Sequence, residues 1–250
     1  MSLVRAAKAR LKTIADRLAN YVIDGEAHDI QRVLQRRALE ETADFVALHM
    51  PMVTPYANNF ALLDAALSCC SLYGLYCEFG VFQGATLNHI ASRVPEKTIY
   101  GFDSFEGLPE DWRATVKAGH FKVGELPTVR SNCKLIKGWF DKTVPGFLKE
   151  HPGPAAFLHI DSDLYSSAKT VLDFFTERIV SGTIIVFDEY FNYPGWKDGE
   201  HKAFGEFVAA NDVKFEFLGY SSRDEQVTVR ISEIRRLPVS RAAQLTAASE

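Results

Sequence analysis

The chain has 250 residues, 47% of them hydrophobic, and a formal net charge of −4 at pH 7. This length fits one α/β domain with an appendage, and the hydrophobic content is ample for a single core. The negative charge excludes the basic surface field typical of nucleic-acid-binding proteins, and no apolar run approaches the roughly 18 residues of a membrane span.

Residues 1–74 are predicted to form a helical N-terminal extension. Apolar residues recur at helical spacing from Leu3 to about Met50, and a third helix is expected near residues 58–72. We expect this extension to pack on the core or to contact a second copy of the chain, giving a homo-oligomer. The alternative is a lid over the active site.

The N-terminus lacks the pattern of a secretory signal peptide, because charged residues alternate along it. The four cysteines show neither a Cys-x-x-Cys pair nor zinc-ligand spacing, so they indicate free thiols in a reducing compartment. A cytoplasmic protein is therefore expected.

A strand at residues 75–79 runs into a glycine turn and a helix start. Glycines in such a turn allow close approach of a ligand to the backbone. A dinucleotide site needs a third glycine, whereas only Gly80 and Gly84 occur here, with two bulky residues between them. Glu78, just before the turn, would repel a phosphate but could hydrogen-bond an amino group or hold a cation. The turn thus favours S-adenosylmethionine, and the alternative is a tight turn without a ligand.

The second strand, at residues 98–103, ends in Asp103, about 20 residues beyond the glycine turn. An acid at this place in a doubly wound sheet accepts hydrogen bonds from the two ribose hydroxyls of a nucleoside. We assign Asp103 and the adjacent Ser104 to the cofactor site. The alternative interpretation of Asp103 is a helix-capping or turn aspartate.

The third strand, at residues 133–136, is followed by Gly138, Trp139 and Phe140. Adenine requires an apolar slot, and this turn offers an aromatic face on a flexible backbone. The same aromatic residues could instead be hydrophobic plugs. Tyr165, at the start of a later helix, could line the cofactor pocket or simply pack.

The fourth and fifth strands, at residues 155–160 and 183–187, are expected to be neighbours and to end in acids. Asp161, Asp188 and Glu189 can therefore converge on one point, where their repulsion would require a neutralising cation. Ligands that are all oxygen favour Mg²⁺, with Ca²⁺ and Mn²⁺ as the alternatives. The alternative is that Asp161 caps a helix and the other two acids begin a solvated loop. His159 is interpreted as a satisfied core histidine.

Strands that alternate with helices from residue 75 onward predict a parallel sheet covered on both faces. Helices are expected near 84–93, 141–150, 165–180 and 200–210, and an antiparallel hairpin at 215–220 and 226–231. This is the class I methyltransferase (Rossmann-like) variant of the doubly wound α/β sheet. The core is predicted to span residues 75–237, with a frayed tail at 238–250.

Five motifs in this order resemble the macrocin O-methyltransferase family, metal-dependent class I enzymes that methylate sugar hydroxyls of macrolides and related natural products. The resemblance covers about residues 70–235. The motifs lie at residues 77–84, 101–109, 137–140, 159–167 and 187–190.

The resemblance implies that S-adenosylmethionine is held by Glu78, Gly80, Asp103 and the turn at 138–140. It also implies Mg²⁺ bound by Asp161, Asp188 and Glu189, and a small-molecule acceptor such as a sugar. Two features depart from the family: a glutamate stands where the family has a second aspartate, and the loop at 190–201 is longer and more aromatic.

The function expected from the sequence is therefore methyl transfer to a hydroxyl that Mg²⁺ acidifies and positions. Asp161, His201 and Lys202 are the candidates for the base. The alternatives are a methyltransferase that uses no metal, a related enzyme with another reaction, and a noncatalytic nucleoside-binding partner.

Overall fold

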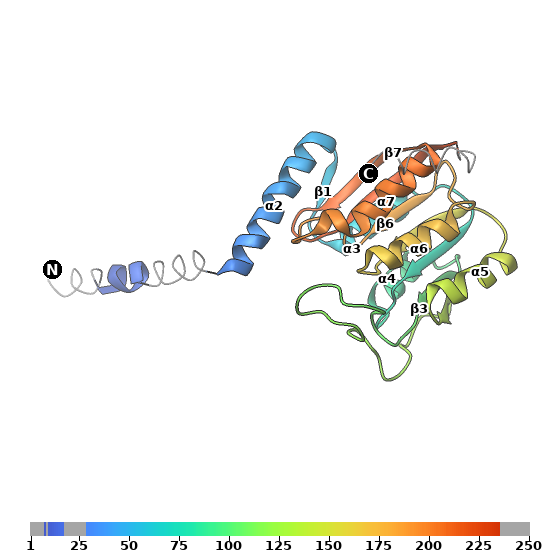
Figure 1. Cartoon of the computed structure of the whole chain (residues 1–250), viewed down its shortest axis with the longest axis horizontal. Coiled ribbons are helices and arrows are strands. Elements are labelled where there is room, and N and C mark those ends of the chain that lie inside the picture. The colour runs from blue at the N-terminus through green and yellow to red at the C-terminus, as the bar shows by residue number, and fades with distance from the viewer. Residues whose placement is uncertain (1–7, 9, 18–28, 236–250) are drawn as a thin grey trace.

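An eight-stranded sheet with helices on both faces forms the body of the protein, as seen in a computed structural model that describes residues 8, 10–17 and 29–235 (Figure 1). The strand order is β1-β7-β8-β6-β5-β2-β3-β4. Strand β8 is antiparallel to β6 and β7, and every other neighbouring pair is parallel. The strands are β1 Thr54–Tyr56, β2 Leu75–Phe79, β3 Ile99–Asp103, β4 Cys133–Lys137, β5 Ala155–Ile160, β6 Ile184–Phe187, β7 Val213–Ser221 and β8 Val227–Ile234.

The predicted doubly wound, mostly parallel sheet with a closing antiparallel hairpin is confirmed. Strand β8 returns between β6 and β7, so the hairpin extends the sheet and does not stand apart from it. The helices are α2 Ile30–His49, α3 Asn59–Cys69, α4 Ala85–Arg93, α5 Phe140–Glu150, α6 Tyr165–Phe175, α7 Glu200–Asn211 and the short 3₁₀ helix η1 Trp196–Asp198.

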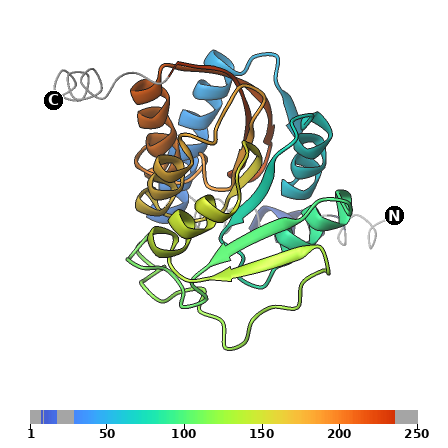
Figure 2. The same cartoon turned by 90° about the vertical axis from the view of Figure 1, so that its right-hand side faces the viewer.

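Two hydrophobic cores lie on opposite faces of the sheet, because successive side chains of a strand point to opposite sides. Phe79 and Ile160 belong to the core shared with α5, α6 and α7, whereas Tyr76 and Phe157 belong to the core shared with α3 and α4. Figure 2 shows these helices on the two sides of the sheet. Strands buried on both faces explain the nearly continuous apolar runs in the sequence.

The N-terminal segment is helical but also contributes a strand to the sheet. Residues 10–17 are helical, and Asp29 caps α2 by accepting hydrogen bonds from the backbone N–H groups of Gln31 and Arg32. Strand β1 pairs with β7, which places this part of the predicted extension on the edge of the core sheet. Leu3 and the predicted tail at 238–250 lie outside the described residues.

The carboxyl ends of the strands position the candidate site. The chain proceeds from β2 to β3 and β4 on one side, then crosses back to β5 and β6 on the other, so the strand order reverses between β2 and β5. Ligands of open α/β sheets bind at such a point. Within the described part of the chain, no helix combines the length and the apolar character needed to cross a membrane.

Candidate functional site

Backbone hydrogen bonds hold the strand ends of β2, β5 and β6 beside one another. The residue that follows each strand donates its N–H to the last part of a neighbouring strand: Gly80 to Phe102, Asp161 to Phe79, and Asp188 to Ile160, each at 2.9 Å. The functional side chains at these positions therefore inherit their spacing from the sheet.

Gly80 is required by the contact between two strand ends. Its φ is +96°, and a Cβ there would overlap the carbonyl oxygen of Asp161. The residue also lies on the wall of a cavity of about 590 Å³. The glycine thus permits close packing of the ends of β2 and β5. From the sequence, the expected reason for a glycine here was close approach of a ligand to the backbone.

Asp103 organises the glycine turn from the end of β3. Its Oδ2 accepts hydrogen bonds from the N–H groups of Val81 and Phe82, both at 2.8 Å, and its Oδ1 accepts one from Phe105 at 2.6 Å. A carboxylate has about four acceptor positions, so one remains on Oδ1. The turn interpretation and the ribose interpretation of Asp103 are therefore compatible.

The large cavity brings together most of the residues predicted for the cofactor. Its wall includes Gly80, Asp103, Ser104, Trp139, Phe140 and Asp161. We call it the donor cavity. The wall also includes Asp163 and Glu189, so the cavity reaches the carboxylates that follow β5 and β6.

The turn after β4 closes one side of the donor cavity. Gly138 has a φ of +140°, and its N–H donates to the carbonyl of Asp103 at 2.9 Å, which ties the turn to the neighbouring strand. Trp139 then precedes α5, and the ring of Phe140 packs edge-on against Phe79 at 5.5 Å. Phe140 thus both packs and lines the cavity, as the two sequence interpretations allow.

Glu78 lies beneath the turn and does not line the donor cavity. Its side chain is fully buried; Oε1 accepts a hydrogen bond from Thr86 at 3.2 Å, and Oε2 lies 3.0 Å from Nδ1 of His159. The other ring nitrogen of His159 lies 3.4 Å from Oδ1 of Asp188. Burial alone would lower the pKa of His159, but hydrogen bonds to Asp188 and Glu78 outweigh it and raise the pKa.

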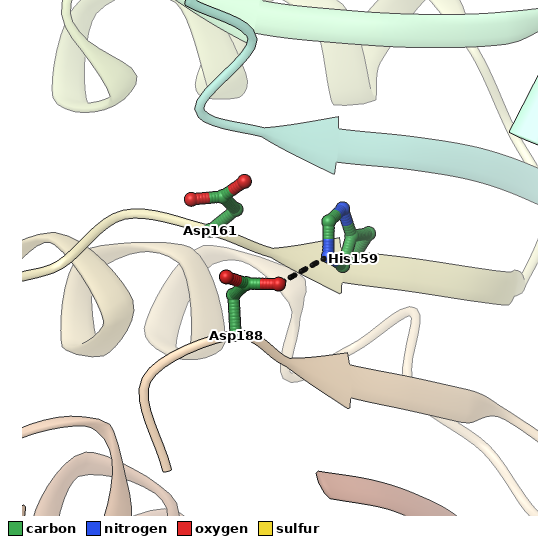
Figure 3. A group of neighbouring side chains, drawn as sticks. All are labelled: His159, Asp161 and Asp188. Atoms are coloured by element: carbon green, nitrogen blue, oxygen red, sulfur yellow. Dashed lines mark ion pairs between the residues drawn. The ribbon is translucent and has the colours of Figure 1, made fainter. Parts of the chain in front are cut away.

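Asp161, Asp188 and His159 form a group whose ligand atoms lie within 4.8 Å of one another (Figure 3). Burial and the charge of Asp188 raise the pKa of Asp161 well above its usual range. Both nitrogens of His159 already face carboxylates, so the imidazole acts as a cation between acids. The two aspartates are therefore the oxygen ligands that this group offers to a metal ion.

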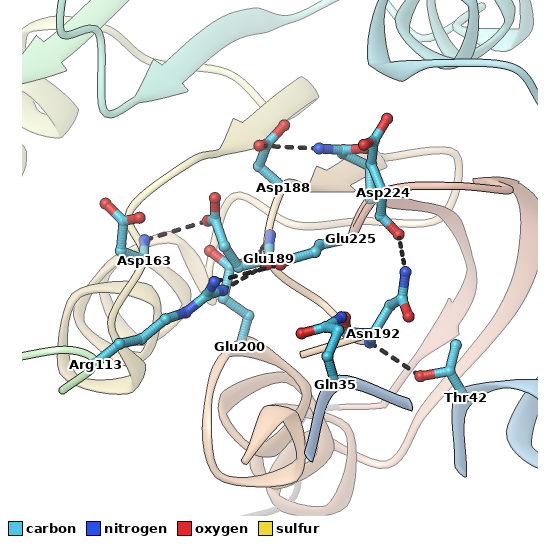
Figure 4. A network of polar contacts seen from close by, with 11 residues as sticks. Gln35, Thr42, Arg113, Asp163, Asp188, Glu189, Asn192, Glu200, Asp224 and Glu225 are labelled. Atoms are coloured by element: carbon cyan, nitrogen blue, oxygen red, sulfur yellow. Dashed lines mark hydrogen bonds and ion pairs between the residues drawn. The ribbon is translucent and has the colours of Figure 1, made fainter. Parts of the chain in front are cut away.

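The third predicted ligand, Glu189, lies beside this group in a second layer of acids (Figure 4). Its Oε2 accepts a hydrogen bond from the N–H of Asp163 at 3.3 Å, and its own N–H donates to Oε2 of Glu200 at 3.0 Å. Burial and the charge of Asp188 raise the pKa of Glu189, and the same two causes raise the pKa of Asp163 to about 7. Negative charge is thus concentrated and incompletely compensated here.

Arg113 supplies positive charge to this cluster. Its guanidinium lies 3.6 Å from the ring centroid of Trp112 and 4.2 Å from that of Tyr193, and it forms an ion pair with Glu225 at 2.5 Å. Stacking between two rings fixes the planar cation. Its charge lowers the pKa of Asp163, opposing the effects of burial and of Asp188.

Gly84, Tyr165 and His201 also lie away from the donor cavity wall. Gly84 is the N-cap of α4 with a φ of +77°, and the hydroxyl of Tyr165 donates to Glu206 on α7 at 2.8 Å. His201 is surrounded by the rings of Phe45, Tyr190 and Trp196, with centroids between 4.8 and 5.5 Å away. The structure therefore places Tyr165 and His201 in packing positions.

Several residues of the cluster have no role predicted from the sequence. They lie in loops or at element ends of three separate segments of the chain: Arg113 in the first, Asn192 and Glu200 in the second, and Glu225 and Gln226 in the third. No local pattern distinguishes them, because only the crossing of the loops brings them together. The Asp-x-Asp pattern that contains Asp163 was visible, but its spacing alone does not indicate burial.

Known methyltransferases resemble this chain in sequence. Residues 77–190 match the family model described as a methyltransferase domain. A Streptomyces olivaceus enzyme, 8-demethyl-8-(2,3-dimethoxy-α-L-rhamnosyl)-tetracenomycin-C 4′-O-methyltransferase, is 25% identical over 198 residues, which are 69% of this chain and 72% of that protein.

Solved structures share the fold. The crystal structure of the calicheamicin methyltransferase CalS11 is similar with a TM-score of 0.58 and 22% identity, over 81% of this chain and 93% of that one. The apo structure of CalS11, a TDP-rhamnose 3′-O-methyltransferase, is similar with a TM-score of 0.51 and 25% identity, over 68% and 77% of the two chains. The domain model, the fold and these relatives identify the chain as an S-adenosylmethionine-dependent O-methyltransferase with the class I fold.

Proposed function

We propose that this enzyme transfers a methyl group, with the help of Mg²⁺, to a hydroxyl of a sugar carried by a natural product. We call Asp161, Asp163, Asp188, Glu189 and Glu200 the acid cluster. The observation that carries the proposal is that three of these acids, Asp161, Asp163 and Glu189, also line the donor cavity. A methyl donor in the cavity would therefore lie next to a site suited to a cation. The two relatives named for sugar substrates, both rhamnose-containing, support a sugar acceptor.

The donor cavity fits a nucleoside that carries no ribose phosphate. Asp103 retains one acceptor position for a ribose hydroxyl, and its charge would repel a phosphate there. Trp139 and Phe140 provide an apolar, aromatic wall for adenine. We assign Gly80 and Ser104 to the same site, whereas Glu78 would act beneath the turn.

The acid cluster fits Mg²⁺ because its free donors are carboxylate oxygens. Asp188 Oδ1 is buried and has no hydrogen-bond partner among the described residues, although it faces His159. A hard cation would satisfy this oxygen and relieve the repulsion that raises the pKa of Asp161. Asp161, Asp188 and Glu189 would hold the ion, with Glu189 offering its Oε1.

When bound, S-adenosylmethionine supplies the methyl group, and Mg²⁺ lowers the pKa of the acceptor hydroxyl. Asp161 is the base that we infer, since it lines the donor cavity and follows the strand beside the glycine turn. An Asp161 carboxylate oxygen would take the hydroxyl proton as the methyl group leaves the donor sulfur for the acceptor oxygen. Phe140 and Trp139 exclude water from the donor side.

Methyl transfer to TDP-rhamnose, measured by mass spectrometry with S-adenosylmethionine and Mg²⁺, tests this proposal. We expect product with Mg²⁺, none after EDTA treatment, and recovery when Mg²⁺ is restored. Asp188→Asn should abolish the recovery while leaving S-adenosylhomocysteine binding intact. Full activity in EDTA would contradict the role of the metal but would still demonstrate methyltransferase activity.

We also propose that the chain belongs to the macrocin O-methyltransferase family and that it self-associates. The order of the five motifs supports the family, and the motifs at 159–167 and 187–190 contribute acids to the acid cluster. Self-association is supported by apolar side chains that α2 exposes, such as Ile30 and Leu48, each more than 70% exposed. Light scattering coupled to size-exclusion chromatography would measure the oligomeric state.

A further inference from the structure

A second cavity, of about 340 Å³, adjoins the donor cavity at the acid cluster. The two cavities share Asp163 and Glu189 as walls, and Asp188 lines only the second one. If the proposed function is correct, an acceptor in the second cavity reaches the acids at the walls that it shares with the donor cavity. We call this space the acceptor cavity.

Two amide side chains on the wall of the acceptor cavity carry oxygens with no partner. Asn192 is 9% exposed and Gln226 is 7% exposed. Asn192 Oδ1 and Gln226 Oε1 are buried and make no hydrogen bond to any residue that the structure describes. Buried polar atoms are nearly always paired in folded proteins, so two such acceptors on one cavity wall indicate a missing donor.

The orientation of each amide is determined by its nitrogen. Asn192 donates from Nδ2 to the carbonyl oxygen of Asp224 at 3.1 Å, and Gln226 donates from Nε2 to Oδ2 of Asp188 at 3.1 Å. Turning either amide over would place an oxygen against an oxygen. The unpaired atoms are therefore acceptors, which hydroxyl donors of a ligand in this cavity would satisfy.

Asn192 is also held firmly by its backbone. Its φ is +65°, a conformation that asparagine tolerates better than most residues. Its N–H donates to Oγ1 of Thr42 at 2.9 Å, and its carbonyl accepts from Nε2 of Gln35 at 2.6 Å (Figure 4). Both partners lie on α2, so this helix helps to position one wall of the acceptor cavity.

We propose that Asn192 Oδ1 and Gln226 Oε1 each accept a hydrogen bond from a hydroxyl group of the acceptor, which makes this cavity a subsite for a polyhydroxylated ring. The ring must bring two hydroxyl donors besides the hydroxyl that is methylated. A pyranose with three free hydroxyls meets this requirement. A catechol, whose two hydroxyls would both face the acids, leaves the amide oxygens unpaired. This inference rests on the proposed function, which places the third hydroxyl, the one that is methylated, at the acid cluster.

Binding of methyl α-L-rhamnopyranoside and its 2-, 3- and 4-deoxy analogues tests the proposal. Titrations are followed by ligand-observed NMR on the full chain with S-adenosylhomocysteine and Mg²⁺. In the wild type, at least two of the three deoxy analogues should bind about tenfold more weakly than the parent, since each of these two lacks one hydroxyl donor to an amide oxygen. No binding of the parent, or equal binding of all four glycosides, would overturn the proposal without any variant.

Two variants then assign the hydroxyls. Asn192→Gly suits the positive φ and removes one acceptor, and Gln226→Met preserves the length of the side chain and removes the other. Each variant should abolish the binding penalty of one deoxy analogue and retain that of the other, as in a double-mutant cycle. Penalties that persist in both variants would contradict the assignment.

Thr228→Val is the matched control. Thr228 is also buried with an unpaired hydroxyl, lies two residues beyond Gln226, and lines neither cavity. Both penalties should persist in this variant. Stabilisation by S-adenosylhomocysteine, measured by thermal shift, should be equal in all variants. Loss of methyl transfer to every sugar with the binding pattern intact would instead contradict the proposed function.

Discussion

Glu78 and His159 form an ion pair in which both side chains are fully buried, with Oε2 and Nδ1 3.0 Å apart. Thr86 occupies the other oxygen of Glu78, and Asp188 lies beyond the other nitrogen of His159. Strand β2, which leads into the glycine turn, is thereby connected to the acid cluster through buried side chains.

Glu78→Gln should destabilise the protein more than it weakens cofactor binding. The change removes the nearer of the two carboxylates that face buried His159, which should cost about 3 kcal/mol of the free energy of unfolding. Urea denaturation measures this loss, and calorimetric titration with S-adenosylhomocysteine should show a nearly unchanged dissociation constant. A large loss of affinity in a protein of normal stability would instead support direct contact between Glu78 and the cofactor.

Gly80→Ala should be strongly destabilising because the new methyl group overlaps the Asp161 carbonyl and the backbone has a positive φ. We expect a loss of about 3 kcal/mol or more in the free energy of unfolding. Gly205→Ala is the matched control, since this exposed glycine of α7 has open space around it. The control should gain up to about 1 kcal/mol. Thermal or urea unfolding measures the stability of both variants. Equal changes in stability would contradict the importance of the close contact between Gly80 and the Asp161 carbonyl.

Asp161→Asn should lower kcat by about a hundredfold or more, the usual contribution of a positioned base. His201→Gln should retain kcat, because His201 lies among aromatic rings and lines neither cavity. Initial rates of methyl transfer at saturating donor concentration compare the two variants. The reverse ranking would return the role of base to His201, one of the candidates from the sequence.

The metal-free protein should lose stability as the pH rises from about 6 to about 8. The pKa of Asp163 is about 7 in the folded chain, well above its value near 3.9 when unfolded, and the pKa values of Asp161 and Glu189 are raised in the same direction. The unfolded chain therefore binds fewer protons in this range, and the stability that the protonated acids contribute is lost as pH rises through the folded pKa.

Mg²⁺ should reverse this loss by replacing the protons. Melting temperatures in EDTA and in Mg²⁺ should differ more at about pH 8 than at about pH 6, because metal and protons compete for the same oxygens. Asp188→Asn should remove the Mg²⁺ effect at both pH values. A melting temperature that rises over this range in EDTA would show that other groups dominate.

The order of strands and helices followed directly from local sequence patterns. Apolar runs bounded by Gly and Pro predicted β2 at residues 75–79 and β5 at 155–160 with the bounds that the structure has, because these strands are buried on both faces. Strand β1 was missed, since three residues that include a proline carry too little periodicity. Its place in the sheet depends on pairing with β7, which lies more than 150 residues further along the chain.

The residues at the strand ends were likewise visible in the sequence, and their partners were not. Asp103 and Asp161 could be placed at one edge because parallel strands align their carboxyl ends. The tertiary structure decided that Glu78 faces His159 under the turn, that His201 lies among aromatic rings, and that Asn192 and Gln226 line the same cavity. A strand determines the direction of its own side chains, whereas the contacts of a loop residue depend on where other loops cross it.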